Sequence, residues 1–226
     1  FYVEKAVVKL GTLVKEQRGR DVFATVLNQY RSKKCDVGHG YAALNALMWQ
    51  TLDECADPPH DVHTAKVIMM LSQTFYTSEE GGKKEKEKEK EKEKERRDGL
   101  CEEEGFGSRE SSRQYLKDYL LPHPLWQDAK YWELLLWECT IEQLHTIPYP
   151  VRWYDMQERE RKEAVKRVHE VLTSQVMAVE HSMLELGCDQ KLVREFVYRM
   201  CALHQLGEGQ RHLLLNHLQA RTRAGT

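Results

Sequence analysis

Apolar residues recur every three or four positions through most of this 226-residue chain, and this spacing is the strongest constraint on its fold. A helix with 3.6 residues per turn places such residues on one face, where they can be buried together. The clearest stripe runs from Val165 to Leu186. No stretch shows the period-two alternation of a half-buried strand. The sequence therefore predicts an all-α fold.

Turn and capping residues divide the pattern into about nine helices, which we expect to form an irregular bundle. Pro58 and Pro59 lack the amide hydrogen that a helix needs to continue, while Gly187 and Asp189 suit a helix end and the next N-cap. The segment 61–75 is apolar on most of its circumference, which predicts the central helix of the N-terminal half. The expected helices cover 1–17, 22–30, 41–52, 61–75, 112–120, 124–144, 155–186, 189–203 and 213–218.

The segment from Glu79 to Arg109 has a different composition. Lysine and glutamate alternate from Lys84 to Glu95, and almost nothing in the segment is apolar enough to bury. Alternation by two places like charges at i,i+4, so a helix there is disfavoured at that spacing. We predict one domain with helical parts at 1–78 and 111–226, separated by a disordered charged insert at 79–110. A regulatory or partner-binding loop is the alternative.

The composition predicts a cytoplasmic protein and gives no reason to expect a nucleic-acid or membrane partner. Lys and Arg total 34 against 36 Asp and Glu, a formal charge of −2 that gives no global reason to bind nucleic acid. The six cysteines lie far apart in the sequence, so we expect reduced core residues rather than a disulfide framework. No apolar run is long enough for a transmembrane segment. Because residue 1 is Phe, we expect the chain to be part of a longer protein.

No motif in the chain indicates catalysis. Phosphate-binding glycine loops, nucleophile elbows and the H-E-x-x-H zinc motif are absent from the sequence. The pairs Cys201/His204, Cys35/His39 and His60/His63 have spacings that can chelate zinc, but each is half a site. We therefore predict no enzyme activity, no catalytic residue, no cofactor and no metal. A metal-binding or enzymatic domain, using some Cys–His pair, is the alternative of another class.

The aromatic residues between 126 and 154 are the candidate partner-binding residues. Core packing is one interpretation, and an interface with wet-edged aromatic anchors is the other. Trp137 falls off the face that its helix must bury, so it either covers a neighbouring helix or is exposed. The charged stretch 157–167 mixes both signs, so we do not expect strong phosphate binding there. The six candidates are Trp126, Tyr131, Trp132, Trp137, Trp153 and Tyr154.

Several short blocks resemble the helical domain of the SET-binding-factor type. That domain occurs in pseudophosphatase myotubularin-related proteins, in the C-terminal region of the DENN-containing MAP-kinase-activating death-domain protein, and in an uncharacterised neuronal cytoplasmic protein. The blocks are mostly aromatic or apolar and follow the same order. They are residues 20–23, Thr64 to Tyr76, Tyr115 to Glu133, Trp153-Tyr154-Asp155-Met156 and Gly187 to Leu218.

The resemblance implies a non-catalytic protein-interaction or scaffold module in membrane trafficking or small-GTPase signalling. The expected partner is another protein: a helix, a small GTPase, or a neighbouring domain of the same chain. Binding is expected in a groove near the Trp126–Trp137 segment. Direct regulation of a Rab-type small GTPase, as regulator or effector, is the alternative. The sequence does not specify the oligomeric state.

Overall fold

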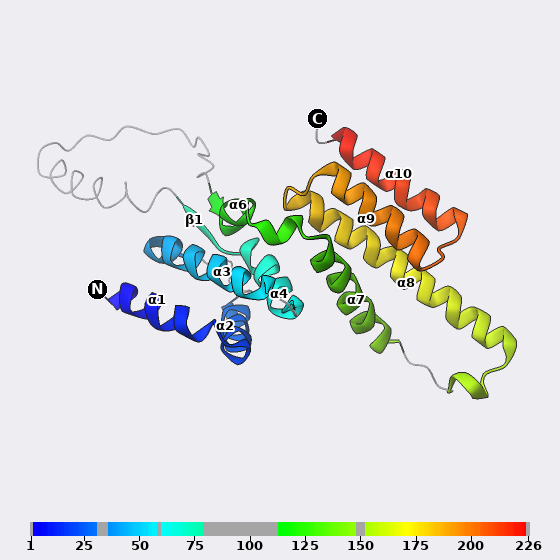
Figure 1. The fold of residues 1–226 in the computed structure, drawn as a ribbon, viewed down its shortest axis with the longest axis horizontal. Helices are drawn as coiled ribbons and strands as arrows, with labels where there is room; N and C mark the ends of the chain where they lie inside the picture. Colours follow the sequence, from blue (N-terminus) through cyan, green and yellow to red (C-terminus); the bar gives the residue numbers. More distant parts are fainter. Residues whose placement is uncertain (1, 31–35, 58–59, 79–112, 148–151, 225–226) are drawn as a thin grey trace, which may run out of the picture. The chain divides into compact units, whose positions relative to one another are not determined.

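The computed structural model describes residues 2–30, 36–57, 60–78, 113–147 and 152–224 (Figure 1). Nine α-helices lie in these residues, so the all-α prediction is confirmed. The predicted insert at 79–110 lies outside them. The helices are α1 (Tyr2–Leu13), α2 (Gln17–Tyr30), α3 (Tyr41–Ala56), α4 (Val62–Ser72), α6 (Leu116–Leu120), α7 (Ala129–His145), α8 (Glu158–Glu185), α9 (Gln190–Leu203) and α10 (Glu208–Ala224). Short 3₁₀ helices are η2 (Gly38–Gly40), η4 (Pro124–Gln127) and η5 (Trp153–Asp155).

A small antiparallel sheet is the exception to the helical pattern. Strands β1 (Tyr76–Ser78) and β2 (Arg113–Tyr115) pair with Tyr76 opposite Tyr115, and the two rings lie 5.7 Å apart. The expectation of a helix that includes Tyr115 is therefore wrong at its start, since α6 begins only at Leu116. Three-residue strands are too short to show alternation, and the partner strand is distant in sequence, so periodicity alone could not reveal the pair.

The chain divides into two compact units. Unit 1 comprises Phe1–Thr51 and Val67–Leu120, and unit 2 comprises Leu52–Lys66 and Leu121–Thr226. Each unit takes residues from both sides of the segment 79–110. The predicted helical parts at 1–78 and 111–226 are therefore segments of the sequence and do not coincide with the two compact units. That they belong to one domain stays a prediction.

In unit 1, the connection between α1 and α2 is closed by backbone contacts around Gly19 and Arg20. The buried Arg20 guanidinium donates to the carbonyl oxygens of Val14 at 3.3 Å and Lys15 at 3.2 Å, which caps the end of α1. A Cβ atom on Gly19 would lie 1.9 Å from the Leu13 carbonyl oxygen, so no side chain fits there. The core of this unit includes Val14, Phe23, Ala24, Leu47, Met48, Ile68, Leu71, Phe75, Leu116 and Leu120.

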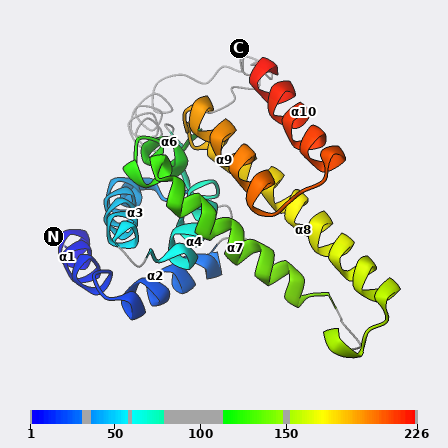
Figure 2. The same cartoon turned by 45° about the vertical axis from the view of Figure 1, so that its right-hand side comes forward.

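Unit 2 is built around α8, which packs against α7, α9 and α10. Figures 1 and 2 both show α8, α9 and α10 side by side. The predicted stripe of α8 is buried from Leu172 to Met183, because three helices cover that half, whereas Val165 remains 42% exposed. The core of this unit includes Leu125, Trp126, Tyr131, Trp132, Leu135, Leu136, Leu172, Val176, Val179, Met183, Val193, Phe196, Val197, Met200, Leu214 and Leu218.

The predicted boundary between α8 and α9 is present in detail. Gly187 adopts φ +72°, the left-handed conformation that favours glycine after a helix. The Cys188 amide donates to the Met183 carbonyl at 3.0 Å, as in a Schellman motif. The Asp189 carboxylate then accepts from the Lys191 amide at 3.1 Å and caps α9.

A buried carboxyl group joins α8 to α10. The Glu180 side chain is fully buried, and one of its carboxyl oxygens lies 3.2 Å from His217 Nδ1. Its other oxygen has no hydrogen-bond partner in the described residues. Burial raises the pKa of Glu180, and the neighbouring His217 and Arg221 only partly oppose that effect. The ionised carboxylate is therefore disfavoured at this position.

We expect Glu180→Gln to flatten the dependence of stability on pH. The folded-state pKa of Glu180 lies above the unfolded value of about 4.5, so the folded chain holds the proton more tightly. The stability from this group is present at low pH and is lost as the pH rises through the raised pKa. Glutamine keeps the size and an acceptor oxygen but cannot ionise.

Urea unfolding from pH 4.5 to 8, followed by tryptophan fluorescence, measures this effect. The range begins at pH 4.5, the ordinary pKa of a glutamate side chain. Glu195→Gln is the matched control, because Glu195 is exposed on α9. A wild-type pH slope that survives in Glu180→Gln would contradict the assignment.

Candidate partner-binding surface

Three of the six candidate aromatic residues are fully buried in unit 2. Tyr131 and Trp132 lie at the start of α7, and Trp126 lies in η4. Their ring centroids are 5.1 to 6.0 Å apart, in tilted or edge-to-face arrangements. The indole nitrogen Nε1 of Trp132 donates to the Trp126 carbonyl oxygen at 2.8 Å. A side chain with no exposed surface cannot contact a partner, so these three residues act through packing.

The buried thiols are poor candidates for a nucleophile. Burial raises the pKa of Cys188 to about 12, and it also raises the pKa values of Cys139 and Cys201. Because the thiolate is the reactive form, the raised pKa values make these three thiols less reactive. The four cysteines in the described residues are free thiols.

Trp137 projects from the face of α7 that is only partly covered. Its side chain is 47% exposed, and its ring centroid lies 5.2 Å from that of His204, at the end of α9. Ile141, one helical turn further on, is also 47% exposed. Burial, with a smaller contribution from His169, lowers the pKa of His204, so a neutral imidazole is favoured beside the indole. Trp137 and Ile141 form a small exposed apolar patch.

The last two candidates, Trp153 and Tyr154, lie in η5, which we call the aromatic turn (Trp153–Asp155). Trp153 is 52% exposed and Tyr154 is 70% exposed. The Arg161 guanidinium, in the first turn of α8, donates to their carbonyl oxygens at 3.2 and 3.4 Å. A capping box between Gln157 and Glu160 fixes the start of α8 next to the turn. The backbone is therefore held in place while both aromatic rings face solvent.

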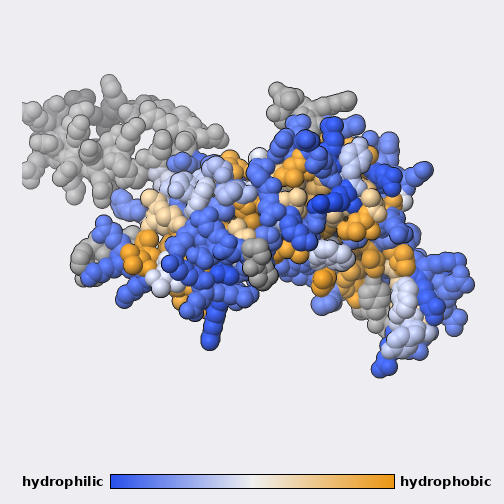
Figure 3. All heavy atoms as spheres, in the orientation of Figure 1, coloured by the Kyte–Doolittle hydropathy of each residue, from blue (hydrophilic) through white to orange (hydrophobic). Residues whose placement is uncertain are grey.

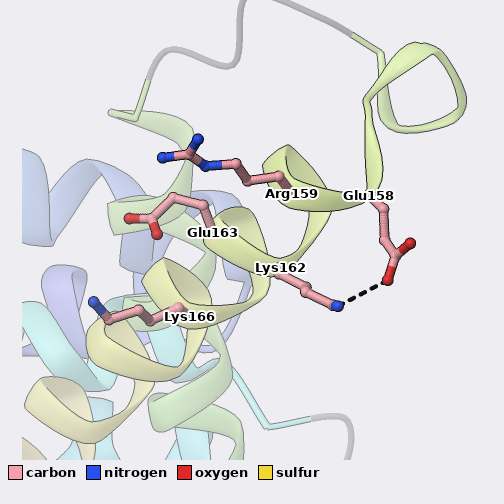
Figure 4. Close-up of a pocket in the computed structure, with 5 residues that line it drawn as sticks. All are labelled: Glu158, Arg159, Lys162, Glu163 and Lys166. Carbon is pink, nitrogen blue, oxygen red and sulfur yellow. Dashed lines mark ion pairs between the residues drawn. The ribbon is translucent and has the colours of Figure 1, made fainter.

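An open, charged stretch of surface follows the aromatic turn along the first three turns of α8. Figure 4 shows Arg159, Glu163 and Lys166 pointing to one side of the helix, whereas Lys162 and Glu158 pair on another. The Lys162–Glu158 distance is 2.8 Å. In Figure 3 this end of α8 is hydrophilic, with the paler residues of the aromatic turn beside it. Such exposed pairs contribute little to stability, so the charges are available to a partner.

A histidine from one of the spaced pairs lies beside two carboxylates in unit 2. His63 lies near Glu138 and Glu142, a grouping that can hold a cation. The Lys66 ammonium already lies 2.7 Å from both Glu142 carboxylate oxygens and 3.2 Å from Glu138. Desolvation lowers the pKa of Lys66, but the carboxylates of Glu142 and Glu138 more than offset this effect, so the pKa is raised. Lys66 therefore supplies the positive charge that a metal ion would otherwise provide.

The other paired residues give no support to a metal site either. His204 contacts Trp137, and Cys201 is buried in the core. Cys35 lies outside the described residues. Sequence reasoning missed the roles of Arg161 and Lys66, because single charged residues on a helix have no distinctive spacing.

No family model and no solved structure matches the chain. A human protein described as "Uncharacterized protein KIAA0513" is 21% identical over 123 residues, covering 49% of this chain and 30% of that protein. This chain thus matches less than a third of the relative's length. In the described residues, no helix is long and apolar enough to cross a membrane.

Proposed function

We propose that the chain is a non-catalytic protein-interaction module of a larger cytoplasmic protein, and that the aromatic turn at the start of α8 is its principal contact surface. The observation that carries this proposal is the anchored backbone of Trp153 and Tyr154, whose rings remain exposed. Aromatic residues presented on a fixed backbone lose little conformational entropy on binding and often dominate protein interfaces. Trp137 and Ile141 are a secondary contact.

The cellular setting of the proposal rests on the sequence blocks shared with SET-binding-factor-type helical domains. Those domains occur in proteins of membrane trafficking and small-GTPase signalling. The raised pKa values of Cys139, Cys188 and Cys201 disfavour the reactive thiolate and fit a non-catalytic role. A small GTPase or a helix of another protein is the proposed kind of partner.

The proposal is tested by affinity capture from cytosol with the full chain, its Trp153→Ala/Tyr154→Ala double variant and a control. Tyr198→Ala on α9 is the matched control, because Tyr198 is 51% exposed and lies on another helix. We expect a defined set of proteins to be retained by wild type and control, and to be lost from the double variant. Purified candidates then confirm direct binding.

If wild type, double variant and control capture the same proteins, the aromatic turn is not the contact surface. Adding Trp137→Ala in a separate chain measures the contribution of the secondary patch. Loading purified Rab-type GTPases with GDP or a GTP analogue separates an effector, which prefers one nucleotide state, from a scaffold that is indifferent to it.

A further inference from the structure

Building on the proposed function, we propose that the aromatic turn and the first turns of α8 bind an acidic amphipathic segment of another protein. The surface combines two exposed aromatic rings with three arginines: Arg152, Arg159 and Arg161. The contacts that the glutamates and arginines around the turn already make indicate the kind of partner.

The glutamates at the start of α8 are largely occupied within the helix. Glu158 pairs with Lys162 at 2.8 Å, and Glu163 lies 3.7 Å from Arg167. A carboxylate oxygen of Glu160 accepts from the Gln157 amide at 2.7 Å and closes the capping box. These contacts reduce, but do not remove, the negative charge beside the arginines.

The three arginines have no carboxylate partner among the residues that the structure describes. Arg161 donates to two neutral carbonyl oxygens, and Arg152 and Arg159 are exposed. Asp155 is the one carboxylate of the aromatic turn, and it forms no ion pair with a residue that the structure describes. The start of α8 adds the positive end of its helix dipole. The surface therefore has an excess of positive charge that can bind carboxylates, which guanidinium groups bind in bidentate geometry.

Two features favour an acidic protein segment over a polyanion. A lipid surface or a nucleic acid requires an extended field of one sign, and the glutamates interrupt such a field along α8. Trp153 and Tyr154 also require apolar groups on the partner between its carboxylates. A helix with an apolar stripe flanked by acidic residues meets both requirements.

The test uses the full chain and fluorescein-labelled peptides of about 18 residues, five helical turns. One peptide carries Leu at i, i+3, i+4 and i+7 with Glu elsewhere, and its comparator carries Lys in place of Glu. Fluorescence anisotropy measures binding at several NaCl concentrations. We expect the Glu peptide to bind more tightly, with affinity falling as salt rises.

Charge reversal identifies the residues responsible. We expect Arg152→Glu/Arg159→Glu to weaken binding of the Glu peptide at least about tenfold. Arg194→Glu, an exposed arginine on α9, is the matched control and should leave binding unchanged. Circular dichroism checks that the variants keep their helical content, since all three positions are exposed.

Several outcomes would overturn the inference. Equal affinity for the two peptides, no binding of either, or insensitivity to the double reversal would each do so. Tighter binding to vesicles containing phosphatidylserine than to the Glu peptide would assign the surface to lipid instead. If the aromatic double variant loses its captured proteins while arginine reversal has no effect, the acidic-segment inference fails and the proposed function stands. If neither change alters capture, both fail.

Discussion

Replacing Trp132 with alanine is expected to destabilise unit 2 by about 3–5 kcal/mol, the usual cost of removing a large buried aromatic side chain. Trp132 has no exposed surface and packs against the rings of Trp126 and Tyr131. The substitution also leaves the Trp126 carbonyl oxygen without the indole donor, although Cys188 Sγ still lies 2.9 Å away. Urea unfolding followed by far-ultraviolet circular dichroism measures the loss.

Trp137→Ala is the comparison that separates core from surface on the same helix. Trp137 is 47% exposed, so its removal should cost less than about 1.5 kcal/mol, within the lower range for single substitutions. A similar loss for both substitutions would mean that the division of the aromatic residues into buried and exposed groups is wrong.

Gly19→Ala is expected to destabilise unit 1 by at least about 3 kcal/mol and to separate α1 from α2. The added methyl group would lie 1.9 Å from the Leu13 carbonyl oxygen, a backbone atom that cannot move without breaking the connection. The hydrogen bonds from Arg20 to Val14 and Lys15 depend on the same close approach. Hydrogen exchange should show lost protection in α1 first.

Gly209→Ala is the matched control for a helical glycine. A Cβ atom at Gly209 meets nothing within 4 Å, so this change should be neutral or should stabilise α10 by about 0.5–1 kcal/mol. Unchanged stability in Gly19→Ala, or equal effects at both positions, would contradict the close approach of the backbone at Gly19.

The candidate surface was only partly predictable from the sequence. The face pattern of α7 indicated that Trp137 falls outside the buried stripe, and the structure places that residue in partial exposure. The apolar face of the expected helix 124–144 included Trp132, whereas Trp153 lay just before the next expected helix, but the pattern did not say which of the two would be exposed. The difference is tertiary: helices of unit 2 cover Trp132, whereas Trp153 lies in a turn before a helix start.

The sequence by itself determined the all-α class and the boundary from Gly187 to Asp189, because periodicity and caps act within a few residues. Several helix ends lie elsewhere than expected, for example the start of α10 at Glu208 rather than at residue 213. Three features depended on the tertiary structure: the Tyr76–Tyr115 strand pair, the Lys66 contact with Glu138 and Glu142, and the Arg161 contact with the aromatic turn. The strand pair and the lysine contact join residues far apart in the chain. The arginine contact spans only eight residues, but it requires the turn to fold back on α8, and no residue spacing encodes that.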